Sequence, residues 1–186
     1  GLLSNYRIKI MDLAGISLAF PGIVDVKHCQ VLATNEKYDD ACDLNLNLKL
    51  WCESNWGVPF YMDNDTRLAT IGEWVCGAAR GLDNVVMMTI GTGIGTGVIL
   101  DGRVLYGEHY QAGSLGGHFV VDYKGRKCSC GNVGCVEALS SSFFLPSIIK
   151  ENLNLSASFK EKADYYDFEQ IFKLASDGDV DALIVC

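Results

Sequence analysis

Three cysteines and a histidine stand close together in the second half of the chain and offer a set of metal ligands. Cys128, Cys130 and Cys135 fall within eight residues, and His118 precedes them by ten positions. Thiolate and imidazole are the ligands that tetrahedral zinc prefers. The interspersed glycines allow a short loop to fold back so that the thiols converge. One disulfide cannot use three thiols, so we interpret the cluster as a zinc-binding loop.

A run in which glycine alternates with other residues is the second candidate for chemistry. It extends from Gly91 to Gly97 and contains the hydroxyls of Thr92 and Thr96. The dinucleotide fingerprint needs a third glycine three residues after the second and then a helix, and a P-loop needs Gly-Lys-Ser/Thr. Neither pattern is present, because a β-prone segment follows the run. We predict a β-loop-β turn whose amides bind phosphate. The alternative is a turn of purely structural use.

Three polar residues, Asp63, Asn64 and Asp65, follow a short apolar run and precede a helical pattern. In α/β sheets, ligands gather where strands end. A carboxylate there can accept a proton from a substrate hydroxyl, and an amide can hold a neighbouring hydroxyl. The alternative is that one or two of these residues cap the helix. The two interpretations are compatible.

The elements that must position these residues follow from hydrophobic periodicity and turn signals. Strands are predicted at 16–20, 60–62, 85–90, 98–100 and 104–105, and helices at about 44–56, 63–79, 137–150, 167–175 and 179–186. The order strand, helix, strand, helix in the first half predicts an α/β layer. The junction at 81–84 is the best candidate for a domain boundary.

Composition narrows the class of protein. The chain has 186 residues, 49% hydrophobic and 20% charged, with a formal net charge of −8. These values are typical of a globular protein, and the absence of a basic stripe argues against nucleic-acid binding by this segment. No apolar run is long enough to span a bilayer, so no membrane partner is expected. The remaining cysteines lie in apolar contexts, where free cysteine behaves as a small core residue: Cys29, Cys42, Cys52, Cys76 and Cys186. We expect a cytoplasmic protein.

Four elements together resemble the ROK family of repressors, open reading frames and sugar kinases. They are Phe20-Pro-Gly-Ile-Val-Asp25, Asn64-Asp65 leading to Gly72-Glu73, the run Gly91–Gly97, and His118 followed by Cys-x-Cys-Gly-x-x-Gly-Cys-x-Glu137. The resemblance covers nearly the whole chain. The cysteine signature with its trailing glutamate is the most specific part, and the other motifs gain weight from their order.

The resemblance implies an α/β fold of the hexokinase/actin-like (ribonuclease H-like) type, a two-lobed ATPase fold with ATP and sugar in the cleft and a zinc-binding loop. Residues 1–82 would form part of the first lobe, which carries the catalytic aspartate. Residues 83–186 would form part of the second lobe, with the phosphate loop and the zinc loop. The fold would be incomplete at both ends, because the family's opening Asp-x-Gly-Gly-Thr strand and its last helices are missing.

Site residues carried over from the resemblance divide by role. Asp65 would be the general base that takes the proton of the attacking sugar hydroxyl. The sugar would be lined by Gly22, Asn64, His118 and Glu137. ATP with Mg²⁺ would be held by Gly91, Thr92, Gly93, Gly95, Thr96 and Gly97. A structural Zn²⁺ would be held by His118, Cys128, Cys130 and Cys135.

One departure from the family pattern bears on the substrate. Family kinases carry Ala-Gly-Glu-x-Gly-His before the cysteines, and that glutamate binds the sugar. Here the segment is Ala112-Gly-Ser-Leu-Gly-Gly-His118, so Ser114 stands where the carboxylate is expected, or the register shifts. Loss of this acceptor would change which hexose fits.

The leading interpretation is an ATP-dependent kinase of a hexose or hexose derivative, of the glucose, N-acetylhexosamine or fructose class. The alternative is the sugar-sensing domain of a ROK-type transcriptional repressor, and a zinc-stabilised structural domain is a third. The chain resembles an interior piece of a longer protein, so the segment alone is expected to be inactive. Related proteins also suggest a homodimer or tetramer.

Overall fold

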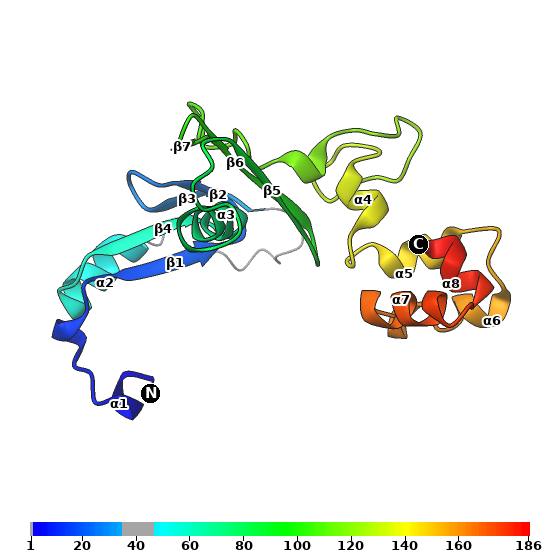
Figure 1. The fold of residues 1–186 in the computed structure, drawn as a ribbon, viewed down its shortest axis with the longest axis horizontal. Helices are drawn as coiled ribbons and strands as arrows, with labels where there is room; N and C mark the ends of the chain where they lie inside the picture. Colours follow the sequence, from blue (N-terminus) through cyan, green and yellow to red (C-terminus); the bar gives the residue numbers. More distant parts are fainter. Residues whose placement is uncertain (1, 35–46) are drawn as a thin grey trace. The chain divides into compact units, whose positions relative to one another are not determined.

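The computed structural model describes residues 2–34 and 47–186, and its internal contacts divide the chain into two compact units. Unit 1 comprises Gly1–Met87 and Thr96–Leu115, and unit 2 comprises Met88–Gly95 and Gly116–Cys186. The chain passes between the units within two strands, β5 (Val85–Ile90) and β6 (Ile94–Leu100), labelled in Figure 1. The predicted boundary between residues 82 and 83 refers to the two lobes of a complete protein. These units of the chain do not test it, so it stays a prediction.

The predicted α/β layer is present in unit 1. Strand β1 (Ile16–Phe20) pairs in parallel with β4 (Phe60–Asn64), in a register that sets Phe20 opposite Asn64. Both strands therefore end at one edge, where the chain turns through Pro21-Gly22. The hairpin of β2 (Ile23–Asp25) and β3 (Gln30–Ala33) is antiparallel.

Two helices follow the sequence predictions with shorter bounds. Helix α2 (Leu48–Trp56) ends at Gly57, whose φ of 67° suits glycine, and the part of its prediction at 44–46 lies outside the described residues. Helix α3 (Asp65–Cys76) stops at Gly77, before the predicted end at 79. Two short elements precede β1, α1 (Leu2–Asn5) and the 3-10 turn η1 (Ile10–Asp12).

The core of unit 1 lies between these strands and α2. Its buried members are Val24, Cys29, Cys52, Phe60 and Met62. Cys29 and Cys52 are thus the small core residues that the sequence predicts. Cys76 and Cys186 are exposed, which corrects that prediction for both, and Cys42 lies outside the described residues.

The glycine run is only partly a loop. Strand β6 already begins at Ile94, so the open turn comprises residues 91–93, and Gly95 to Gly97 are β-strand. The predicted hairpin follows, with positive φ at Asp101 and Gly102 and a short strand β7 (Arg103–Val104). The sheet order is β5-β6-β7. A strand after the turn agrees with the exclusion of a dinucleotide fingerprint.

Unit 2 is built from short helices. The 3-10 turn η2 (Gly116–His118) precedes the cysteine loop, and α4 (Val136–Ser140) follows it. The helices α5 (Leu145–Glu151), α6 (Ala157–Lys160), α7 (Phe168–Ser176) and α8 (Val180–Val185) come next, with a 3-10 turn η3 (Ala163–Tyr165) between α6 and α7. The predicted helix 137–150 is therefore two helices.

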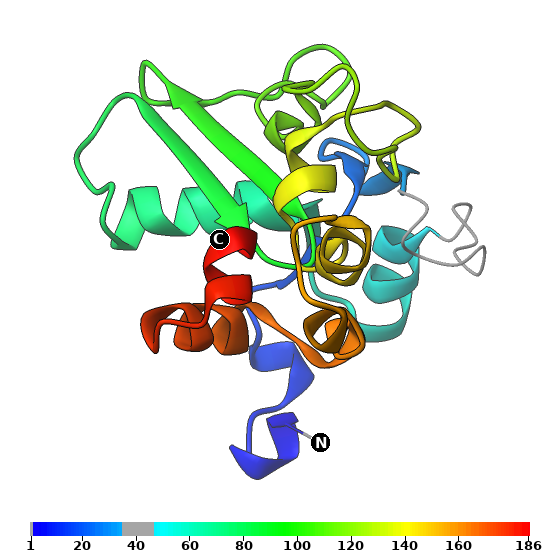
Figure 2. The ribbon, with the colours of Figure 1, turned by 90° about the vertical axis from the view of Figure 1, so that its right-hand side faces the viewer.

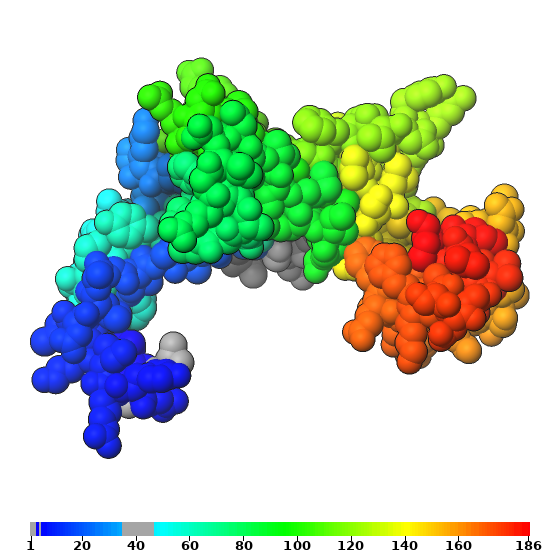
Figure 3. Space-filling model, in the orientation of Figure 1, coloured from blue at the N-terminus to red at the C-terminus, as the bar shows by residue number. Residues whose placement is uncertain are grey.

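The helices after α4 share one core. Helices α7 and α8 lie side by side in Figures 1 and 2, and Figure 3 shows residues 145–186 as one closely packed cluster. The buried members of this core are Leu145, Ile149, Leu155, Phe159, Ala163, Ile171 and Ala182. Within the described ranges, no helix combines the length and hydrophobicity needed to cross a membrane.

Candidate functional site

Asn64 joins the end of β4 to the turn after β1. As N-cap of α3, its Oδ1 accepts a hydrogen bond from Arg67 N at 3.1 Å. Its Nδ2 donates to the carbonyl oxygen of Gly22 at 3.0 Å. The structure thus brings together Gly22 and Asn64, two residues predicted to line a sugar, and the capping alternative holds for Asn64.

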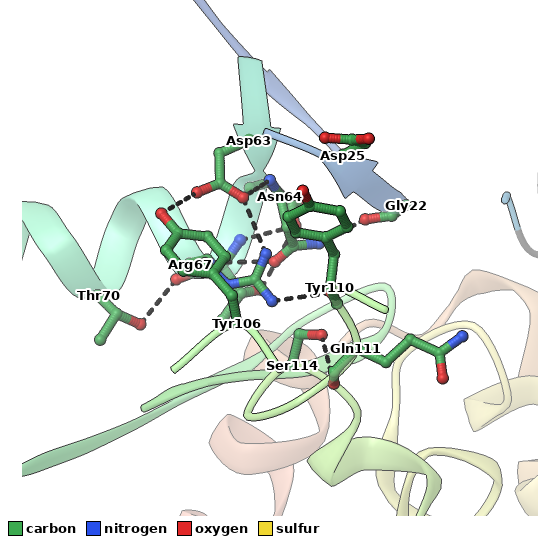
Figure 4. A network of polar contacts seen from close by, with 12 residues as sticks. Gly22, Asp25, Asp63, Asn64, Arg67, Thr70, Tyr106, Tyr110, Gln111 and Ser114 are labelled. Atoms are coloured by element: carbon green, nitrogen blue, oxygen red, sulfur yellow. Dashed lines mark hydrogen bonds and ion pairs between the residues drawn. The ribbon is translucent and has the colours of Figure 1, made fainter. Parts of the chain in front are cut away.

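Asp63 turns into the interior and is 5% exposed. Its Oδ1 accepts a hydrogen bond from Arg67 Nη1 at 2.9 Å, and the Tyr106 hydroxyl donates to its Oδ2 at 3.0 Å, as drawn in Figure 4. Burial first, and then the charge of Asp63, raises the pKa of Tyr106 to about 12, so the phenol stays a donor at neutral pH. Asp63 is therefore committed to a buried ion pair.

Asp65 differs from its two neighbours because its side chain is exposed. Its Oδ1 accepts from Thr66 N at 2.7 Å, a contact within the first turn of α3. The N-terminus of a helix favours a negative charge at this position. Of the three polar residues at this junction, Asp65 is the exposed one, and its role as general base stays a prediction.

Arg67 links this junction to the segment 106–114 and was not singled out from the sequence. Its Nη2 donates to the carbonyl oxygens of Tyr110 at 3.1 Å and Ala112 at 3.4 Å, and its guanidinium lies 4.7 Å from the ring centroid of Tyr106. The side chain is 1% exposed. The one available signal was the i,i+4 spacing of Asp63 and Arg67.

Asp25 anchors the β2–β3 hairpin at the rim of the same network. It accepts hydrogen bonds from Lys27 N at 2.9 Å, His28 N at 3.1 Å and His28 Nδ1 at 2.6 Å. Burial acts to raise the pKa of Asp25, but the hydrogen bonds from His28 and Tyr110 outweigh it and lower the pKa to about 2. Burial, together with the contact to Asp25, raises the pKa of Tyr110.

The segment that carries Ser114 is held by the same unit. Ser114 Oγ donates to the carbonyl oxygen of Gln111 at 3.0 Å, and Figure 4 shows both residues beside the Arg67 network. Thr96 Oγ1 donates to the Gly113 carbonyl oxygen at 2.8 Å. A Cβ at Gly97 would overlap the Thr70 hydroxyl of α3. Thr96 and Gly97 thus pack unit 1, and their predicted contact with a nucleotide stays a prediction.

The remaining predicted phosphate ligands, Gly91, Thr92, Gly93 and Gly95, belong to unit 2. Gly91 N donates to the Gly93 carbonyl oxygen at 3.0 Å and closes a tight turn. Thr92 at its tip is exposed. The turn is therefore short, with Thr92 exposed and its two flanking glycines half-buried, and it is shorter than the sequence predicts.

The four predicted metal ligands converge in unit 2. One donor atom from each of them lies within 4.8 Å of the others: His118, Cys128, Cys130 and Cys135. Cys130 Sγ and Cys135 Sγ are 3.7 Å apart, and Cys128 Sγ lies 3.6 Å from His118 Nδ1. A zinc–sulfur distance of about 2.3 Å gives tetrahedral edges of about 3.8 Å. The donor set and its spacing therefore fit a tetrahedral ion with four protein ligands.

The backbone of the loop explains this convergence. Lys127 and Val133 form an antiparallel bridge, and Cys128 N donates to the Asn132 carbonyl oxygen at 2.7 Å. Gly131 and Gly134 close the loop with φ of 90° and 73°. A side chain at Gly134 would also overlap the backbone of Asp122.

Burial raises the pKa of two of the thiols in this loop, those of Cys128 and Cys135. Cys135 is fully buried, and burial is the largest reason that its pKa is raised to about 12. A metal ion binds the thiolate, so it must replace this proton.

Glu137 lies two residues beyond Cys135 and is 3% exposed. Its Oε2 accepts from Ile94 N at 2.8 Å, and Ser129 Oγ donates to its Oε1 at 3.3 Å. The structure thus brings Glu137 to the cysteine loop. Gly22, Asn64 and Asp65 belong to unit 1 and His118 and Glu137 to unit 2, so their convergence on one sugar stays a prediction.

Sequence relatives of this chain include both repressors and kinases. It is 32% identical over 171 residues to the xylose repressor of Bacillus subtilis, covering 92% of this chain and 41% of that protein. It is 30% identical over 189 residues to the glucokinase of Halalkalibacterium halodurans, covering 98% of this chain and 56% of that protein. The chain thus spans about half the length of the relatives it matches.

A solved structure supports the same relationship. The fold matches a ROK family glucokinase from Streptomyces griseus in complex with glucose and AMPPNP, with a TM-score of 0.73, 29% identity and coverage of 94% of this chain and 57% of that one. The ROK family model matches residues 1–186. With the motifs, the fold and the relatives in agreement, the chain belongs to the ROK family.

Proposed function

We propose that the protein transfers the γ-phosphoryl group of ATP to a hydroxyl of a hexose or hexose derivative, of the glucose, N-acetylhexosamine or fructose class, with Asp65 as general base. The observation that carries this proposal is the division of roles at the β4–α3 junction. Asn64 caps the helix and Asp63 pairs with Arg67, whereas Asp65 is exposed at the first position of α3. Its carboxylate contacts only the adjacent Thr66 in the described hydrogen bonds, and a solvent-exposed carboxylate of this kind is suited to proton transfer.

The proposed reaction is an in-line displacement. The sugar hydroxyl oxygen forms a bond to the γ-phosphorus while the bond from that phosphorus to the bridging oxygen breaks, and ADP leaves. Asp65 accepts the hydroxyl proton. Such transfer depends mainly on positioning and on neutralisation of charge, so the protein needs few reacting groups of its own.

Sugar binding is proposed for four residues. In unit 1, the Gly22 carbonyl and the Asn64 amide already contact each other at the edge where two parallel strands end, which is where α/β sheets bind ligands. In unit 2, His118 and Glu137 lie at the cysteine loop. Oε1 of Glu137 has only long contacts among those described, from Ser129 Oγ at 3.3 Å and Cys128 Sγ at 4.0 Å, whereas Oε2 accepts the shorter hydrogen bond from Ile94 N at 2.8 Å.

Nucleotide binding is proposed for the turn at Gly91–Gly93. The two glycines have no side chains to keep phosphate oxygens away from the backbone amides, and Thr92 between them is exposed. Mg²⁺ would accompany the nucleotide. A structural Zn²⁺ is proposed at the Cys/His cluster, where it would hold the loop closed with no position left for water. Assembly of the whole protein into a dimer or tetramer is part of the same proposal.

A second candidate is the sugar-sensing domain of a transcriptional repressor. Two observations favour it: the 32% identity to a xylose repressor, and the absence of a carboxylate from the segment Ala112–His118, where the resemblance to the kinases implies a sugar-binding glutamate. A sensor needs to bind sugar but needs no general base. The distinction therefore depends on whether Asp65 does chemistry.

The test is a panel of hexoses assayed with the full-length protein, MgATP and a coupled measurement of ADP release. Asp65→Asn is expected to abolish sugar-dependent ADP release, while calorimetry still detects the sugar at an affinity within a few fold of the unmodified protein. Asp177→Asn, at an exposed aspartate after α7, is the matched control and is expected to retain full activity.

One result would count against the kinase, and a different one against Asp65 as its general base. Sugar binding without ADP release across the panel favours the sensor, above all if the sugar changes the affinity of the full-length protein for DNA. Normal turnover by Asp65→Asn would exclude Asp65 as the base.

A further inference from the structure

Three contacts tie the backbone at residues 91–94 to the Cys/His cluster within unit 2. Ser142 N donates to the Gly91 carbonyl oxygen at 2.9 Å, and Ile94 N donates to Glu137 Oε2 at 2.8 Å. The third is a close approach, since a Cβ at Gly117 would overlap the carbonyl oxygen of Ile94. We call residues 91–94 the glycine turn. It is thus held at both of its ends.

Each of these contacts lies near a predicted metal ligand in the chain. Gly117 directly precedes His118, and Glu137 follows Cys135 by two residues. Ser142, which contacts Gly91, is connected to the ligand Cys135 through helix α4. Cys135 is the N-cap of this helix, and Ser142 lies just beyond its C-cap. A displacement of the ligands therefore moves the residues that hold the glycine turn.

The buried carboxylate of Glu137 is the strongest of these links. A carboxyl group that is 3% exposed needs hydrogen-bond partners within the protein, because an unpaired polar group is costly to bury. Oε2 accepts a hydrogen bond from Ile94 N, and Oε1 faces the Ser129 hydroxyl between the first two cysteines of the loop. One side chain thus joins the cysteine loop to the glycine turn.

We infer that the closed Cys/His cluster sets the conformation of the glycine turn, with Glu137 as the positioning residue and Gly117 as the contact that leaves no room for a side chain. The inference rests on the proposed function in one respect, namely that the turn binds nucleotide phosphates. Metal binding at the cluster would then control nucleotide affinity as well as local folding.

The first measurement does not depend on nucleotide. Amide hydrogen exchange of Ile94 in the full-length protein reports directly on its bond to Glu137. Removal of metal with a chelator is expected to speed this exchange by at least about tenfold, because loss of the bond leaves the Ile94 amide free to exchange with water. Glu137→Gln is expected to speed it with the metal still bound. Unchanged exchange at Ile94 after metal loss would overturn the inference.

The second measurement is the affinity for AMPPNP with Mg²⁺, determined by calorimetry. Gly117→Ala is expected to weaken nucleotide binding by about tenfold or more while the zinc content stays at one per chain. Gly72→Ala is the matched control, because a Cβ at this exposed helical glycine meets nothing within 4 Å. If Gly117→Ala fails to fold, Ser129→Ala removes the hydroxyl that contacts Glu137 and spares all four ligands, and it is expected to weaken nucleotide binding more mildly.

The two readouts separate the two ideas. Coupled exchange at Ile94 in a protein that binds no AMPPNP would refute the proposed phosphate role and leave the coupling intact. Nucleotide binding at unchanged affinity in a folded Gly117→Ala protein, or in Ser129→Ala where that variant replaces it, would refute the coupling and leave the proposed function intact.

Discussion

The guanidinium of Arg67 and the carboxylate of Asp63 form an ion pair of 2.9 Å in which the two side chains are only 1% and 7% exposed. The second terminal nitrogen, Nη2, donates to the carbonyl oxygens of Tyr110 and Ala112 in the segment 106–114. The pair therefore fixes the β4–α3 junction, where Asp65 lies, to the segment that carries Ser114. It does so without occupying the solvent-facing side of the junction.

Arg67→Met is expected to lower the free energy of unfolding by about 3–5 kcal/mol, because it leaves the Asp63 carboxylate buried without its cation. Arg67→Lys is expected to recover only part of this loss, since an ammonium lacks the planar fork that reaches both the carboxylate and two carbonyls. Urea unfolding measures both. Arg103→Met, at an exposed arginine of β7, should stay within about 0.5 kcal/mol. A loss at Arg67 no larger than at Arg103 would contradict this account.

Asp25 makes stability depend on acid pH. Its pKa is lowered from 3.8 to about 2 in the folded protein, so the stabilisation is present above about pH 4 and is lost as the pH falls through about 2. The effect is about 1 kcal/mol, less than the full shift implies, because solvent screens the exposed imidazole of His28. The unfolding free energies of the unmodified protein and Asp25→Asn are therefore expected to converge between pH 4 and pH 2. A constant difference over this range would exclude Asp25 as the source.

Much of the local structure could be predicted because its signals are local. The run at 16–20 and its Pro-Gly turn are β1 and the turn after it, and Asn64 and Asp167 cap the helices that the sequence places beside them. The predicted helix at 137–150 is interrupted at Ser141–Phe144. Pro146 indicates this interruption, because it lies in the first turn of α5, where proline is favoured, but the helical pattern of the surrounding residues masks it.

The errors arise where packing between distant segments decides. Gly97 lies in β6, where a side chain would overlap Thr70 of α3, and no spacing within the glycine run reveals that neighbour. The Arg67 network could not be predicted for the same reason, because the carbonyl oxygens that accept from Arg67 lie 43 and 45 residues away in the sequence. The metal cluster was accessible to prediction because all of its ligands lie within 18 consecutive residues.

Zinc binding can be tested at a ligand that is not in the core. Metal analysis of the purified protein is expected to give about one zinc per chain, and Cys130→Ser is expected to lose the metal and to expose the loop 126–134 to proteolysis. Cys130 is exposed, so the substitution itself leaves no cavity, and any effect reports on the ligand set. Cys76→Ser, at another exposed cysteine, is the control and should retain the metal. Protein without zinc after purification in the absence of chelators would refute the assignment.

Gly97 separates a packing role from a phosphate-binding role. Gly97→Ala is expected to destabilise the protein by about 1–3 kcal/mol, since its Cβ would overlap the Thr70 side chain and α3 would have to shift. The Thr70 hydroxyl also donates to the Thr66 carbonyl oxygen at 2.8 Å, so Thr70→Ala removes the overlapping hydroxyl together with that hydrogen bond. In the Thr70→Ala background, Gly97→Ala is therefore expected to cost clearly less than alone, which a double-mutant cycle by thermal or urea unfolding measures. Equal costs in both backgrounds, together with weaker AMPPNP binding by stable Gly97→Ala protein, would instead indicate that Gly97 contacts the nucleotide.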